Sequence, residues 1–133
     1  MTKSKAHAAL FAGATLWCLI IVVAPLTSAS AVYAVFSIIC HQDPARSWHM
    51  AGEPLPVCIR RASIYFAFFV SLWLNLPGDV RWLRFAIAIL AVEFVFARFV
   101  ADVAAVRAMT GLIFGAAAAP FVKRGVGELS ESL

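Results

Sequence analysis

The strongest constraint on the fold is a series of long apolar runs. Ala8 to Ala24 is 17 residues without a charge. Trp82 to Val100 and Val103 to Val122 are longer and predominantly apolar. At about 1.5 Å of rise per residue, the first run extends about 25 Å as a helix, which just crosses the hydrocarbon core of a bilayer. The chain is 63% hydrophobic and 14% charged, whereas a soluble domain is about half apolar and about a quarter charged. These features predict an integral membrane protein.

We expect one transmembrane domain over residues 1–133, folded as an all-α bundle. Four segments are predicted to span the membrane, namely Ala8–Ala24, Cys58–Leu76, Trp82–Val100 and Val103–Val122. Leu26 to Cys40 is short for a span, so we expect a separate short helix there, capped by Thr27 or Ser28, that delivers Cys40 to one membrane face. If this segment crosses fully instead, the loop that follows it changes sides.

Prolines and polar residues set the expected ends of the helices. Pro25 and Pro120 are expected to break or kink their helices, because proline removes a backbone hydrogen bond. The polar tail from Lys123 to Leu133 is expected to fray. No small-residue cleavage site leads from the first apolar run into a soluble region, so we expect that run to be retained as a membrane helix.

The basic residues predict an orientation. With four spans, six of them share one side of the membrane, which the positive-inside rule makes cytoplasmic, together with both termini. These six are Lys3, Lys5, Arg81, Arg84, Lys123 and Arg124. The net charge of +4 is scattered, and no basic run carries interleaved aromatic residues. The expected partner is therefore the lipid bilayer and not nucleic acid.

A polar loop over residues 41–57 interrupts the apolar chain. Three prolines and a glycine exclude a regular helix through it, namely Pro44, Gly52, Pro54 and Pro56. Sulfur and imidazole nitrogen are ligands that zinc and other transition metals favour. Four such side chains lie in or beside the loop: Cys40, His41, His49 and Cys58. Their spacing is not that of a standard zinc finger, so a metal site, a Cys40–Cys58 disulfide and two unpaired thiols all stay open.

The loop also carries a resemblance to a known family. Its residues Cys40-His41-Gln42-x-Pro44-x-Arg46-Ser47-Trp48, followed by Gly52-x-x-x-Pro56-Val57-Cys58-x-Arg60 and Ile64-Tyr65, resemble the signature of the domain of unknown function 2085 family. Arg107, Thr110, Gly111 and Gly115 are similar to a later pattern of that family, so the likeness spans roughly residues 25–120. The resemblance implies a small helical protein of the bacterial inner membrane, multi-pass, with a metal-binding or redox role and no named activity.

One departure from the family pattern falls at the end of this loop. The family that the chain resembles typically reads Cys-x-Arg-Cys-Thr-Gly-Ile-Tyr, and Arg61 stands here where its last cysteine would be. A guanidinium cannot ligate a metal. Either His49 completes a ligand set with Cys40, His41 and Cys58, or this member has lost the site.

Three arginines form a second candidate site. Arg46, Arg60 and Arg61 lie near one interface, where they would hold lipid phosphates or another anion, or only snorkel to the headgroups. Gln42, Asp43 and Ser47 are expected to form hydrogen bonds within the loop and not to act as catalysts.

Charged residues in the apolar runs form a third candidate. Burying an ionisable side chain in a membrane helix costs free energy unless a group of opposite charge pairs with it. If the last two helices form a tight hairpin near Asp102, helical rise brings Glu93 and Arg107 within reach of each other. We therefore predict a Glu93–Arg107 ion pair, with Arg98 and Asp102 nearer the surface. The pair would fix packing, relay protons or contact a substrate.

Three functions compete. The leading hypothesis is a metal or redox site built from the loop cysteines and histidines, with Arg46 and Arg60 orienting the loop or binding an anion. The second is a non-catalytic subunit, a homo-oligomer or an assembly partner in a larger membrane complex, because Gly111 and Gly115 form a GxxxG pair that permits close helix contact. The third is a membrane enzyme or transporter that handles a lipid or an anion. No nucleotide-binding or hydrolase motif occurs.

Overall fold

The computed structural model describes residues 2–132 of the protein. Its elements are α1 (Lys3–Thr27), α2 (Ser30–Ser37), a 3₁₀ helix (Pro44–Arg46), β1 (His49–Met50), β2 (Glu53–Pro54), α3 (Ile59–Leu74), α4 (Val80–Phe99) and α5 (Ala104–Ser132). The predicted all-α class is confirmed, since the strands of the described residues form only one small antiparallel hairpin. The short helix expected before Cys40 is α2.

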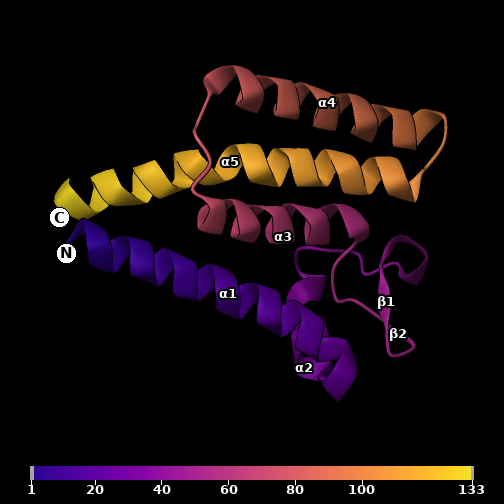
Figure 1. Ribbon diagram of the computed structural model, residues 1–133. Coiled ribbons are helices and arrows are strands. Elements are labelled where there is room, and N and C mark those ends of the chain that lie inside the picture. The colour runs from indigo at the N-terminus through magenta and orange to yellow at the C-terminus, as the bar shows by residue number, and fades with distance from the viewer. Residues whose placement is uncertain (1, 133) are drawn as a thin grey trace.

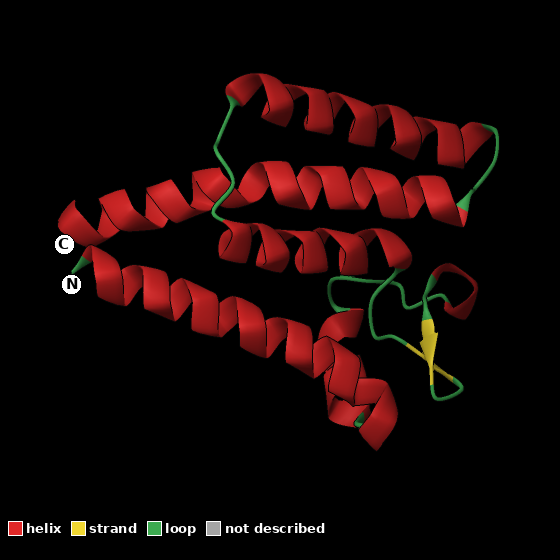
Figure 2. Cartoon of the chain, in the orientation of Figure 1, coloured by secondary structure: helices red, strands yellow, loops and turns green. Residues whose placement is uncertain are grey.

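Four long helices run alternately in opposite directions (Figure 1). The helices α3, α4 and α5 lie in a layer with α5 between the other two, and α1 crosses beside α3. Helix α5 contacts α1, α3 and α4, and its most extensive contact is with α3. Both ends of the described chain lie together at one end of the bundle, and the loop with its hairpin lies at the other end (Figure 2).

The surface of the bundle is apolar. By length and composition, α1 and α5 are the helices of the described chain that could each cross a bilayer. Large side chains face outward on the other helices as well, with Phe99 81% and Trp73 68% exposed. A surface of this kind is stable against lipid and not against water. The protein therefore places much of its outer surface in contact with the bilayer.

The close packing of α3 on α5 depends on two glycines. A Cβ atom added at Gly111 would lie 2.6 Å from the carbonyl oxygen of Arg60, and one added at Gly115 would lie closer still to the carbonyl oxygen of Ile64. The two glycines are four residues apart and so share one face of α5. The GxxxG pair is thus used inside the chain, where it brings two backbones together, and not on a free face for a partner.

Helix α5 continues through Pro120, contrary to the expected break. Proline lacks the N–H that would bond the carbonyl of Ala116, four residues earlier. The hydroxyl of Ser71 on α3 donates to that carbonyl at 3.0 Å. The neighbouring helix satisfies the orphaned acceptor, which is how a proline is tolerated in a membrane helix.

The expectations for the ends of the helices also need correction. Helix α1 runs past Pro25 to Thr27 and ends in a left-handed Ser28, with φ of 49°. Neither Thr27 nor Ser28 caps α2, whose N-cap is Ala29 without a side-chain hydrogen bond. The tail expected to fray is helical to Ser132.

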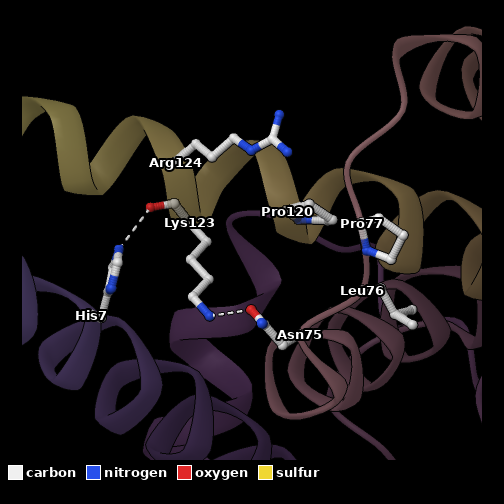
Figure 3. A pocket seen from close by; sticks show the side chains of 7 residues that line it. All are labelled: His7, Asn75, Leu76, Pro77, Pro120, Lys123 and Arg124. Atoms are coloured by element: carbon white, nitrogen blue, oxygen red, sulfur yellow. Dashed lines mark hydrogen bonds between the residues drawn. The ribbon is translucent and has the colours of Figure 1, made fainter.

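Contacts with α1 and α3 explain why the tail is ordered (Figure 3). The His7 Nε2 atom lies 3.2 Å from the carbonyl oxygen of Lys123, and the Lys123 ammonium donates to Asn75 Oδ1 at 2.6 Å. Lys3 pairs with Glu131 at 2.7 Å farther along. His7, Asn75 and Lys123 line a cavity of about 290 Å³ at this end of the bundle. Together the three contacts fix the last turns of α5 against α1 and the end of α3.

The glycine contact makes a direct prediction. Replacing Gly115 with leucine forces α3 and α5 apart, so the free energy of unfolding in detergent should fall by about 1–3 kcal/mol. Gly125 is the matched control on the same helix, since an added Cβ there meets nothing within 4 Å. Equal stability of Gly115→Leu and Gly125→Leu in thermal unfolding would contradict the glycine contact.

Candidate functional site

A small apolar cluster fixes the loop to the helices. Ile21 of α1, Phe36 of α2, Leu55 and Val57 of the loop and Ala62 of α3 are buried together. Helix α2 precedes the loop and α3 follows it, so the cluster holds both ends of the loop against the helices. Burial of these side chains holds an otherwise irregular segment in one place.

Gln42 joins the two sides of the loop. Its side-chain amide donates to the carbonyl of Tyr33 at 2.6 Å and to the carbonyl of Pro56 at 3.1 Å. The Tyr33 hydroxyl donates to the carbonyl of Pro54 at 2.5 Å. Gln42 itself has φ of 52°, a left-handed conformation that turns the chain sharply after Cys40. These bonds bring residue 40 beside residue 58.

Asp43 and Ser47 form hydrogen bonds inside the loop, as the sequence predicted. The carboxylate of Asp43 accepts the N–H of Ala45 at 3.0 Å and caps the 3₁₀ helix that begins at Pro44. The Ser47 hydroxyl donates to the Asp43 carbonyl at 3.2 Å. Their contacts order the loop backbone around the cysteines.

Cys40 and Cys58 meet at the start of α3. The backbone N–H of Cys58, the N-cap residue of that helix, donates to the sulfur of Cys40 at 3.3 Å. All three cysteines are free thiols. A sulfur at a helix N-terminus faces unpaired N–H groups and the positive end of the helix dipole, which favour the thiolate.

The two thiols differ in acidity. Burial opposes ionisation of Cys40, but hydrogen bonds from the backbone of Gln42 and Cys58 and from the side chains of Cys58 and Arg61 together lower the pKa of Cys40. Burial raises the pKa of Cys58, and the charge of the neighbouring Cys40 raises it further. The pKa of Cys40 is therefore shifted below that of Cys58.

The thiols open onto a cavity of about 800 Å³ between the loop and the ends of α3, α4 and α5. His41 lines the same cavity, whereas His49 lies in β1 with an exposed side chain and does not. Five arginines line it as well: Arg46, Arg60, Arg61, Arg98 and Arg107. Polar and sulfur groups are thus concentrated at one end of an apolar bundle.

The predicted metal ligands are only partly brought together. Within residues 2–132, no three His, Cys, Asp or Glu side chains gather closely enough to hold a metal ion. Cys40 and Cys58 supply two donors, and a closed zinc site takes four. Zinc or another transition metal on Cys40, His41, His49 and Cys58 stays a prediction.

The predicted Glu93–Arg107 ion pair is wrong. Glu93 is 5% exposed and receives two hydrogen bonds from Arg60 of α3, from Nε and Nη2, each of 2.8 Å. The Arg60 guanidinium also lies 5.4 Å from the centre of the Phe94 ring. The partner of Glu93 thus comes from α3, a third helix that a hairpin of α4 and α5 considered alone does not include.

Arg107 pairs instead with Asp102, at the turn between α4 and α5. Asp102 also receives Arg46 of the loop at 3.0 Å, so it links the loop to α5. Thr110 donates to the Arg107 carbonyl at 3.2 Å. Sequence reasoning placed Asp102 near the surface and missed its role as the acceptor for two arginines.

These observations define a membrane protein with an arginine-rich, thiol-bearing cavity at one end. The chain belongs to the family described as "Predicted membrane protein (DUF2085)", whose match covers residues 40–121. The match begins at Cys40, later than the resemblance suggested, and it contains the loop, both thiols and all five arginines of the cavity.

A relative shares a shorter segment. The Uncharacterized protein MJ1492 of Methanocaldococcus jannaschii is 44% identical over 41 residues, which is 31% of this chain. The chain covers 26% of the length of that relative. No solved structure matches the chain.

The Arg60–Glu93 pair gives a testable prediction. Glu93→Gln leaves the Arg60 cation without its buried partner, so the free energy of unfolding should fall by about 3 kcal/mol. Glu128→Gln on the exposed side of α5 is the control and should leave stability within about 0.5 kcal/mol. Double-mutant cycles of unfolding in detergent should give a coupling energy between Glu93 and Arg60 and none between Glu93 and Arg107. Coupling of Glu93 to Arg107 alone would contradict the Arg60–Glu93 pair and support the ion pair expected from the sequence.

Proposed function

We propose that the protein is a four-span protein of the bacterial inner membrane with a redox-active Cys40–Cys58 dithiol at the membrane interface. The observation that carries the proposal is the hydrogen bond from the backbone N–H of Cys58 to the sulfur of Cys40 at the N-terminus of α3, with Arg61 beside that sulfur. A dithiol with one acidic and one less acidic thiol is suited to exchange with a disulfide.

The alternating direction of the long helices supports four spans. If α1, α3, α4 and α5 all cross, then α2 lies at the loop end and does not cross. At 16 residues, α3 extends about 24 Å, so it would cross only with local thinning of the bilayer. Its partners α1 and α5 cover one side of it, so its polar atoms need not face lipid.

The charges support a loop that faces outside. The end of the bundle that contains both chain ends carries Lys3, Lys5, Lys123 and Arg124, and the first turn of α4 at the same end adds Arg81. The loop end carries five arginines, but Arg46, Arg60 and Arg107 are paired there with carboxylates. More cations without a carboxylate partner among residues 2–132 therefore lie at the other end, and the positive-inside rule would place that end in the cytoplasm. The thiols would then lie on the oxidising side of the membrane, where disulfides form and persist.

The proposed chemistry is thiol–disulfide exchange with a disulfide-bearing protein or peptide. The Cys40 thiolate attacks one sulfur of that disulfide, forming a mixed disulfide and releasing the other sulfur as a thiolate. Cys58, having lost its proton to solvent, attacks Cys40 and releases the second thiolate. The partner disulfide is reduced to two thiols, and the pair in this chain is oxidised to one disulfide.

The lowered pKa of Cys40 predicts the pH dependence of its alkylation. Only the thiolate reacts, so the rate of iodoacetamide labelling of Cys40 should reach half of its maximum below the pH of about 8.5 that an ordinary thiol requires. Arg61→Gln removes a group that stabilises the thiolate and should move this midpoint upward. Arg84→Gln is the control, because Arg84 lies at the end of α4 away from the cavity. An unchanged midpoint in Arg61→Gln would exclude the arginine from this role.

Exchange can be tested directly by mass spectrometry. Purified protein treated with oxidised glutathione should form an internal Cys40–Cys58 disulfide, and Cys58→Ser should stop at the mixed disulfide on Cys40. Cys18→Ser, in the middle of α1, should behave as the wild type. Failure of both disulfides to form defeats the dithiol proposal. Stoichiometric zinc in the untreated protein, lost in Cys40→Ser, would favour the metal site instead.

A further inference from the structure

The cavity at the loop end has an excess of positive charge. Its five arginines are accompanied by three carboxylates, those of Asp43, Glu93 and Asp102, which leaves a surplus of two positive charges. Ionisation of Cys40 offsets one of them. A surplus of positive charge in a cavity is stabilised by a bound anion.

The surplus is located on particular arginines. Arg46 and Arg60 are held by carboxylates at 3.0 Å and 2.7 Å. Arg61 and Arg98 form no ion pair with any described residue, and Nη1 of Arg61 is buried without a hydrogen-bond partner among residues 2–132.

Arg107 adds a second unsatisfied donor. Its side chain is 5% exposed and binds Asp102 through Nη2. Its Nε atom is buried, and nothing in the described part of the chain accepts its hydrogen bond. A buried charged donor without an acceptor is costly, and an oxyanion in the cavity would supply the missing acceptor.

We propose that this cavity binds a phosphate group through Arg61, Arg98 and Arg107. Arginines of α3, α4 and α5 line the same cavity, and the planar N–H groups of a guanidinium match the oxygens of phosphate. The three arginines come from three helices, so the site exists only in the folded bundle. The thiols are not part of this binding set, although Arg61 also stabilises the Cys40 thiolate. Arg98→Gln tests phosphate binding without changing that arginine.

The size and wall of the cavity indicate what carries the phosphate. A volume of about 800 Å³ is far larger than a single ion and is typical of a site for a small organic molecule. Phe94 and Ala97 of α4 line the cavity, and Phe94 is 60% exposed on the outer surface. A lipid headgroup would enter beside Phe94 with its chains along α4, and a free phosphate would enter past the loop.

The experiment is titration of purified protein in a non-ionic detergent with two probes. One is inorganic phosphate and the other is a short-chain phosphatidylglycerol, with sodium chloride at matched ionic strength as the blank. Binding is measured by tryptophan fluorescence and by the midpoint of thermal unfolding. Binding of the lipid alone identifies a headgroup site, binding of phosphate alone identifies an ion site, and binding of both shows that the phosphate group suffices.

Variants connect binding to the cavity. Arg98→Gln and Arg61→Gln should each weaken binding about tenfold or more, because each removes a charged hydrogen-bond donor. Arg98 is exposed, so its variant should fold normally, which the unfolding midpoint without ligand checks. Arg84→Gln should bind as the wild type. No binding of either probe, or binding that persists unchanged in the Arg61→Gln/Arg98→Gln double variant, overturns the proposal.

Discussion

The close approach of α5 to α3 determines where every group of the cavity lies. Gly111 contacts the backbone of Arg60, so the first turns of the two helices are held side by side at the loop end. Arg107, one turn before Gly111, is thereby placed in the cavity, and Arg60 is directed toward Glu93 on α4. Small residues at a helix interface allow van der Waals contact between backbones, which drives association in lipid where the hydrophobic effect is absent.

The polar end of the bundle is organised by hydrogen bonds to carbonyl groups and by ion pairs between elements. Gln42 joins the two sides of the loop, and Asp102 joins the loop to α5. Arg61 gives the start of α3 a cation beside the Cys40 sulfur. A cation beside a sulfur stabilises the thiolate and disfavours a bound metal cation, so Arg61 favours thiol reactivity over metal ligation.

The sequence predicted the helices better than it predicted their partners. Length and apolar composition located the five helices, because burial in lipid requires long, predominantly apolar runs whatever the tertiary contacts are. The Glu93–Arg107 pair failed because sequence shows which residues need a partner and not which helix faces them. The break at Pro120 failed for a similar reason, since the Ser71 hydroxyl that compensates for it lies 49 positions earlier in the chain. The proximity of Cys40 to Cys58 was one of the alternatives expected from the sequence. The exposure of His49 was not, because it depends on the β1–β2 hairpin, which residue propensities do not specify.

The compensated proline has a mechanical consequence. At Pro120, α5 lacks one internal hydrogen bond and is supported there from outside by Ser71, so the helix is joined more weakly along its axis than elsewhere. The part before this point carries Arg107 and both glycines, and the part after it is tied to α1 through Lys123 and Glu131. Pro120 is therefore the point of α5 at which a tilt of its first part would cost the fewest internal hydrogen bonds, and a tilt that ended there would not reach the opposite face of the membrane.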